Sequence, residues 1–203
     1  MPISDHAVPT RELSVPPSRS GLNGPDPGAP VLRCFIALWP DPAARDQLDT
    51  LANRLQQNNA GSRRVVREDL HLTLAFIGAL AANRAHRVAA MLEAIAAPHF
   101  AWILDRVGGF DRAHVAWAGG TEDPRLAALA QAARVGLDAL QVAYDHKPFV
   151  AHVTLLRKVA HAPSPEACAP IAWSVSAPVL AVSERDEHGR VRYRPWSEPP
   201  AGI

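Results

Sequence analysis

Cysteine, net charge and long apolar runs are all scarce in this sequence of 203 residues. Its two cysteines, Cys34 and Cys168, lack metal-ligand spacing and are too few for a disulfide scaffold, which is typical of the reducing cytosol. The formal net charge of +1 excludes a protein that holds long nucleic acid mainly by a broad basic field. No stretch reaches the ~18 apolar residues of a membrane span, and Met1 to Leu13 contains no secretory apolar region. We therefore expect an unexported cytoplasmic protein with no membrane partner.

Apolar residues make up 48% of the chain and charged residues 20%, enough to bury one full-sized core or two small packed lobes. Residues 1–30 differ from the rest, because they hold seven of the nineteen prolines and show no apolar periodicity. We predict a disordered Pro/Gly/Ser-rich tail over 1–30 and a folded domain over 31–203.

Short apolar runs alternate with three amphipathic helices along the folded part. Helices are predicted from Asp41-Pro42 to about Asn58–Gly61, over 85–96, and from Asp123-Pro124 to Leu140. Strands are predicted over 31–38, 64–67, 70–77, 100–107, 114–118, 149–156, 175–183 and 191–193, with the fourth and fifth joined around Gly108-Gly109 and the last two forming a hairpin. This order indicates an α+β protein with largely antiparallel sheets.

The two halves of the chain repeat the same order of features. Each runs strand, Asp-Pro, helix and then His, and the offset is 82 positions between Asp41 and Asp123 and 81 between His71 and His152. An internal duplication predicts two lobes related by a pseudo-two-fold axis, with two mainly antiparallel sheets flanking a central cleft and the helices outside. Trp39 and Trp117 occupy equivalent places in the two halves and are predicted to be core residues, with base-stacking platforms as the alternative.

The candidate catalytic residues lie in two four-residue motifs, which we call the tetrads: His71-Leu-Thr-Leu and His152-Val-Thr-Leu. Side chains alternate between the faces of a strand, so His71 and Thr73 point one way while Leu72 and Leu74 point into the core. His152 and Thr154 repeat this arrangement. Related lobes would place one imidazole on each flank of a shared pocket.

A pair of histidines across a pocket suits in-line displacement at phosphorus. One group must take a proton from the nucleophile while another protonates the leaving group, and histidine can do either near neutral pH. Threonine hydroxyls can donate hydrogen bonds to the phosphate oxygens. No metal is predicted, because two histidines without a carboxylate or cysteine at ligand spacing make only half a zinc site.

The sequence leaves two roles open for Arg157. It lies five positions after His152, which puts it on the opposite face of a regular strand unless the strand bends or ends there. It is then either a bidentate phosphate clamp or a solubilising charge.

The tetrads and their flanks resemble the 2H phosphoesterase superfamily. Segments Arg33–Pro40, Glu68–Gly78 and Phe149–Arg157 are similar to the bacterial and archaeal RNA 2′,3′-cyclic phosphodiesterases, historically called 2′-5′ RNA ligases. The resemblance implies a bilobal fold and metal-independent hydrolysis of a terminal 2′,3′-cyclic phosphate to a 2′-phosphomonoester, without a cofactor. It implies that His71 protonates the leaving 3′ oxygen and His152 activates water. It further implies that Thr73, Thr154 and Arg157 contact the phosphate and that Phe149 faces the terminal base.

These observations predict a monomeric enzyme whose substrates are RNA ends or small cyclic nucleotides, without a stable protein partner. A non-catalytic module that captures nucleotides or RNA ends is the alternative from another class, although both tetrads are complete. Joining of RNA ends through a 2′-5′ linkage, or opening of a different cyclic phosphate, would use the same site and is not distinguished by sequence.

Overall fold

The computed structural model describes residues 30–96 and 99–197. Its helices are α1 (Pro42–Gln57), α2 (Ala82–Glu93) and α3 (Pro124–Ala139), with short 3₁₀ turns η1 (Arg67–Asp69) and η2 (Asp111–Ala113). Its strands are β1 (Val31–Leu38), β2 (Arg63–Arg64), β3 (Leu72–Ala81), β4 (Phe100–Phe110), β5 (Val115–Gly119), β6 (Val153–Arg157), β7 (Glu166–Val175), β8 (Val179–Arg185) and β9 (Val191–Pro195). The predicted tail, apart from its last residue, lies outside the described residues.

The two Asp-Pro pairs begin helices α1 and α3, as predicted. The Asp41 carboxylate accepts a hydrogen bond from the Ala44 amide at 3.0 Å, and the Asp123 carboxylate accepts one from the Arg125 amide at 2.8 Å. Each carboxylate thus satisfies one of the unpaired amides of a first helical turn, and each proline occupies a position that needs no amide hydrogen. The repeated dipeptide is therefore a structural signal in both halves.

Hydrogen bonding joins nine antiparallel strands into one sheet. The order is β7-β4-β5-β6-β3-β1-β8-β9, with β2 paired to β6 outside this path. This order is symmetric about its middle, so β6 corresponds to β3 and β5 to β1. The α+β antiparallel class is confirmed, and the two expected sheets are linked into one because Leu72 of β3 pairs with Val153 of β6.

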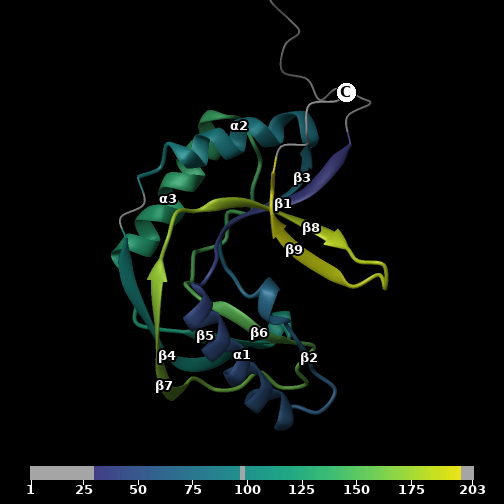
Figure 1. Cartoon of the computed structure of the whole chain (residues 1–203), viewed down its shortest axis with the longest axis vertical. Coiled ribbons are helices and arrows are strands. Elements are labelled where there is room, and N and C mark those ends of the chain that lie inside the picture. Colours follow the sequence, from purple (N-terminus) through teal and green to yellow (C-terminus); the bar gives the residue numbers. More distant parts are fainter. Residues whose placement is uncertain (1–29, 97–98, 198–203) are drawn as a thin grey trace, which may run out of the picture.

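Each half of the sheet is covered by a helix from the other half of the chain. Helix α1, which follows β1, packs on β6 and β7, whereas α3 packs on β3 and α2. Figure 1 shows α2 and α3 together at one end of the molecule and α1 at the other. Most of the buried hydrophobic residues form one core between these helices and the central strands, and Phe35, Ala37 and Ala181 form a second, small cluster. No helix in the described ranges is long and apolar enough to cross a membrane, and both cysteines are free thiols.

Several strand predictions were wrong in detail. Strand β6 begins at Val153 rather than at 149, and Val175 ends β7 instead of beginning the strand that precedes the last one. Strand β4 runs through Gly108 and Gly109, and the chain turns only at η2. The glycine at 108 makes room for an aromatic ring, because a Cβ there would lie 2.5 Å from Cζ2 of Trp117. Strand β7 was not predicted at all: it is a largely exposed edge strand that contains Pro170, a residue tolerated in strands mainly at edges.

Candidate active site

The two predicted catalytic histidines lie at the centre of the sheet. His71 immediately precedes β3 and His152 immediately precedes β6, and the first residues of these strands, Leu72 and Val153, are the pair that joins the two halves. The imidazoles are close enough for a charge on His152 to lower the pKa of His71. The structure therefore brings together side chains that are separated by 81 positions in the sequence.

Both imidazoles are held in the same way by the backbone. Nδ1 of His71 lies 2.7 Å from the carbonyl oxygen of Asp69, and Nδ1 of His152 lies 2.7 Å from that of Val150. Because a carbonyl oxygen can only accept, we assign the proton of each neutral ring to Nδ1. Nε2 of each ring is then an acceptor, and among the described residues no hydrogen-bond partner occupies it. Each ring is fixed in the tautomer that can take a proton at Nε2.

A matching bulge follows each threonine and decides where Arg157 lies. In β6, Thr154 pairs with Trp117 and Leu156 with Ala116, so that Leu155 is an extra residue without a partner. Leu155 and Leu156 are both buried, and the alternation of faces shifts by one. Arg157 consequently lies on the same face as Thr154 rather than on the opposite one.

The first half contains the equivalent bulge in β3. Thr73 pairs with Ala37 and Ala75 with Ile36, which leaves Leu74 as the extra residue. Its counterpart to Arg157 is Phe76, which is half-buried and has the Arg33 guanidinium over its ring at 5.0 Å. The two halves therefore share the same backbone bulge but carry different side chains at this position, an arginine in β6 and a phenylalanine in β3.

Burial is the main influence on both histidines. Burial, the largest cause, together with the positive charge of Arg157 lowers the pKa of His71 to about 4, although the hydrogen bond from the imidazole to the Asp69 carbonyl acts in the opposite direction. Desolvation and Arg157 likewise lower the pKa of His152 below its usual value. Since both values lie below 6.5, both rings are neutral at pH 7 before any anion binds. The shared effect of Arg157 places its charge near both rings.

Aromatic residues surround the histidines, and sequence reasoning largely missed them. The ring of His71 lies 4.8 Å from Phe35 and 5.6 Å from Trp39, between ring centroids, and the edge of Tyr193 lies at 5.0 Å. Phe110 contacts His152 at 5.0 Å in an edge arrangement. These rings supply the low-dielectric surroundings that depress the histidine pKa values.

The prediction that Trp39 and Trp117 are equivalent core residues was wrong. Trp39 is half-buried, stacks on His71 and donates a hydrogen bond from Nε1 to the Glu68 carbonyl at 3.2 Å. Trp117 is opposite Thr154, and the residue opposite the corresponding Thr73 is Ala37. The alternation of Phe35, Ala37 and Trp39 along one face was the signal that could have placed Trp39 at the site.

Asp69 ties the C-terminal hairpin to His71. Its carboxylate is buried, with the residue only 4% exposed, and it accepts hydrogen bonds from Nε of Arg192 at 3.0 Å and from the Tyr193 amide at 2.9 Å. Its carbonyl oxygen is the partner of His71. One residue therefore fixes both the imidazole and the strand that brings Tyr193 against it.

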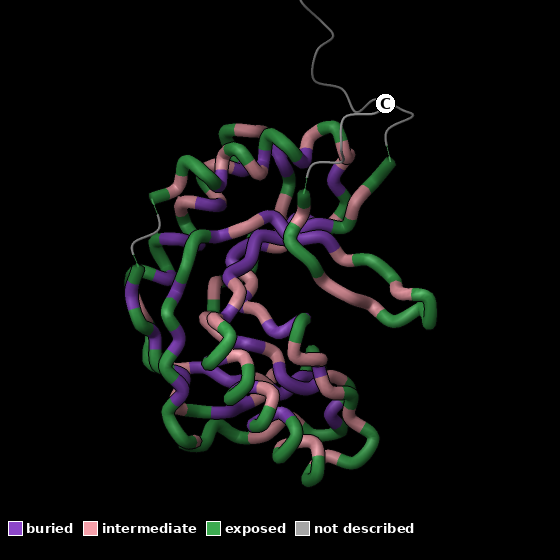
Figure 2. The backbone as a smooth tube through the Cα atoms, in the orientation of Figure 1, coloured by how far each residue is buried: buried purple, intermediate pink, exposed green. Residues whose placement is uncertain are grey.

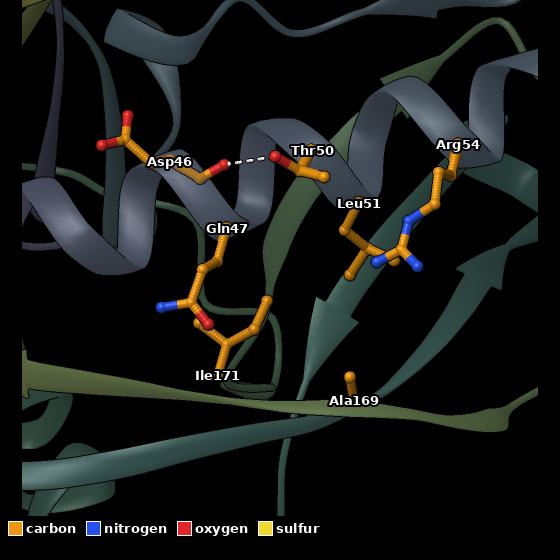
Figure 3. Close-up of a pocket in the computed structure, with 7 residues that line it drawn as sticks. All are labelled: Asp46, Gln47, Thr50, Leu51, Arg54, Ala169 and Ile171. Atoms are coloured by element: carbon orange, nitrogen blue, oxygen red, sulfur yellow. Dashed lines mark hydrogen bonds between the residues drawn. The ribbon is translucent and has the colours of Figure 1, made fainter.

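Phe149 lies beside a large cavity next to the second motif. The cavity has a volume of about 740 Å³, and Trp117, Val150 and Ala151 also line it. Phe149 itself is half-buried and packs against the core. This cavity adjoins His152 through Ala151 and is large enough for a nucleobase. The pocket between α1 and β7 in Figure 3 contains none of the predicted site residues, and its Thr50 hydroxyl is already bonded to the Asp46 carbonyl.

Metal ligands do not gather anywhere in residues 30–96 or 99–197. No group of three or more His, Cys, Asp or Glu side chains there has the arrangement of a metal site. The two histidines therefore have no third ligand among the described residues.

Comparison with known proteins gives the family. Residues 38–117 match the sequence model described as LigT-like phosphoesterase. The chain is also 32% identical over 138 residues to a protein of Escherichia coli (strain K12) named RNA 2′,3′-cyclic phosphodiesterase, a match that covers 66% of this chain and 76% of the relative. The chain belongs to the LigT-like phosphoesterase family. The resemblance inferred from the two tetrads is thereby confirmed.

Other members of the LigT-like family agree with this assignment. A protein of Archaeoglobus fulgidus, also named RNA 2′,3′-cyclic phosphodiesterase, is 29% identical over 129 residues, covering 62% of this chain and 72% of the relative. The crystal structure of E. coli LigT complexed with 3′-AMP superposes with a TM-score of 0.74 at 29% identity, covering 83% of this chain and 97% of that one. The fold of the LigT-like family is therefore the fold seen here.

Proposed function

We propose that this protein hydrolyses the 2′,3′-cyclic phosphate ends of RNA to 2′-phosphomonoesters, without a metal ion, by acid and base catalysis from two histidines. One observation carries the proposal: both imidazoles are held at Nδ1 by a carbonyl two residues upstream, which leaves Nε2 of each ring to exchange a proton, and the charge of Arg157 acts on both rings. The names of the E. coli and A. fulgidus relatives support the reaction and the RNA substrate.

In this proposal His152 is the general base. Its Nε2 removes a proton from water as the water oxygen forms a bond to phosphorus, and the bond from phosphorus to the 3′ oxygen breaks on the opposite side. His71 delivers a proton from Nε2 to the leaving 3′ oxygen. One water is consumed, the phosphate stays on the 2′ oxygen, and the next cycle needs one proton moved from His152 to His71.

Substrate binding favours uptake of a proton from solvent by His71. The free imidazole is neutral at pH 7 because burial lowers its pKa to about 4. A phosphate anion beside Nε2 favours the imidazolium form and raises that pKa, since an opposite charge within about 4–6 Å stabilises the charged state. The acid is thus charged when its substrate is present.

The remaining predicted residues would bind the substrate. We assign the hydroxyls of Thr73 and Thr154 and the guanidinium of Arg157 to the non-bridging phosphate oxygens, whose charge grows in the transition state. We assign Phe149 to the terminal base, because its ring borders the cavity next to His152. We further propose that the enzyme acts as a cytoplasmic monomer, since one chain supplies both histidines and both cysteines are free thiols.

The proposal is tested by product analysis with and without a chelator. An RNA ending in 2′,3′-cyclic phosphate should yield only the 2′-monophosphate, and EDTA should leave the rate unchanged. Chromatography against 2′- and 3′-phosphate standards resolves the two products. A 3′-phosphate product would reverse the assignment of the bond that breaks, and loss of activity in EDTA would refute the metal-free mechanism. Tight binding of the RNA without turnover would indicate a binding module instead.

A further inference from the structure

A second cavity, which we call the arginine groove, lies between the β2–β6 pair and strand β9. Its volume is about 240 Å³. Five arginines and Tyr193 contribute to its lining: Arg63, Arg64 and Arg157 from one side, and Arg190 and Arg192 from the other. The one acidic residue in the lining, Asp69, is buried and already bonded to Arg192 and the Tyr193 amide. Arg64 is ion-paired with Asp49, Arg190 with Asp186 and Arg192 with Asp69, so among the described residues the uncompensated positive charge of the groove lies on Arg63 and Arg157.

Two of these arginines face each other without a counterion. Arg63 of β2 is directly opposite Arg157 of β6 in the antiparallel pair, which puts both side chains on one face. Within the described part of the chain neither guanidinium forms an ion pair with a carboxylate. Like charges directly opposite one another destabilise a strand pair, and a guanidinium is well shaped to bind phosphate oxygens. An anion in the groove would offset this repulsion.

Both arginines of the other wall form ion pairs. Nε of Arg190 lies 2.9 Å from the Asp186 carboxylate, and Nε of Arg192 lies 3.0 Å from Asp69. Both arginines therefore have terminal nitrogens that these contacts do not use. Figure 1 shows the β8–β9 hairpin projecting from the body of the protein on the side of β2, and Figure 2 shows its outer part as exposed.

The groove shares residues with the surroundings of the candidate active site. Arg157 lines the groove, and its charge acts on both catalytic histidines. Tyr193 also lines it, and its ring edge lies 5.0 Å from the His71 ring. A polyanion whose last phosphate lies between the histidines can therefore place an earlier phosphate among the arginines.

We propose that the arginine groove binds the backbone phosphates of the nucleotides that precede the terminal cyclic phosphate, so that the preferred substrate is an RNA oligonucleotide rather than a cyclic mononucleotide. This inference rests on the proposed function for the location of the reacting end. It accounts for the guanidinium of Arg63 opposite Arg157, which hydrolysis of a mononucleotide does not need.

The test compares two substrates with the same terminal nucleoside: a nucleoside 2′,3′-cyclic monophosphate and an RNA pentamer ending in that cyclic phosphate. The wild-type kcat/KM should be at least tenfold higher for the pentamer. Arg63→Gln should lower the ratio of the two kcat/KM values by about three- to tenfold, because it removes a charge from the groove. Arg63→Lys, which keeps the charge, should restore most of the ratio. Arg87→Gln removes an equal charge from the exposed surface of α2 and should leave the ratio unchanged.

Binding provides a measurement that does not depend on turnover. The Kd of a labelled RNA pentamer with a 3′-phosphate end is measured by fluorescence anisotropy at several salt concentrations. The slope of log Kd against log salt concentration should be lower by about 0.7 in Arg63→Gln than in the wild type, which corresponds to the loss of one contact to a single-strand phosphate. Equal kcat/KM values for the two substrates, or an unchanged salt slope, would overturn the proposal that the groove binds RNA backbone phosphates. Absence of turnover on both substrates with an intact change in slope would instead overturn the proposed function and leave the groove supported.

Discussion

Replacement of either catalytic histidine by alanine is expected to lower kcat on an RNA 2′,3′-cyclic phosphate by about 10²–10⁴-fold, the usual contribution of a positioned acid or base. His152→Ala loses the group that removes the proton from water, and His71→Ala loses the group that protonates the leaving oxygen. Because the two act in one step, the double variant should be little slower than the slower single variant. Steady-state rates at pH 7 measure all three.

The matched control is His86→Ala. His86 is exposed on α2 and carries no predicted role, so its replacement tests the loss of an imidazole as such. Circular dichroism should show each variant folded. Wild-type rates in either His71→Ala or His152→Ala would rule out the two-histidine mechanism.

Arg157→Gln is expected to reduce kcat/KM by about 10²-fold and, at the same time, to raise the pKa of both histidines. The kinetic loss follows from removal of a bidentate, charge-assisted contact to the phosphate. The positive charge of Arg157 disfavours the imidazolium form of both histidines and so lowers their pKa values. Removal of this charge should therefore raise both pKa values. Nuclear magnetic resonance titration of the ring signals of His71 and His152 measures it without substrate.

Arg157→Lys separates charge from geometry. Lysine keeps the positive charge, so the histidine pKa values should stay low, but it cannot bind two phosphate oxygens in the planar manner of arginine. Part of the loss in kcat/KM should therefore persist. Histidine titrations identical in wild type and Arg157→Gln would show that the arginine does not act on the site as described.

Local signals in the sequence were sufficient for the framework of the site. The Asp-Pro caps, the repeated order of elements and the alternation of His71 with Thr73 depend on neighbours within a few positions, and the structure agrees with each. The convergence of His71 and His152 followed from the internal repeat, because a duplication predicts a symmetric partner for every element.

Features that depend on an irregular backbone or on distant pairing could not be derived in this way. The position of Arg157 is set by the bulge at Leu155, and strict alternation puts this arginine on the wrong face. The opposition of Arg63 and Arg157 arises from a strand of two residues whose partner is far along the chain. Tyr193 reaches His71 because β9 pairs with β8 and is bonded to Asp69, and no local pattern encodes that contact.

The most direct test of the account is a crystal structure of the protein with a nucleoside 2′-monophosphate, the expected product. The account predicts Nε2 of His71 and Nε2 of His152 at hydrogen-bond distance, about 2.7–3.2 Å, from different oxygens of the same phosphate. Arg157 should contact that phosphate as well. A phosphate bound away from the two rings, or contacted by only one of them, would contradict the central claim.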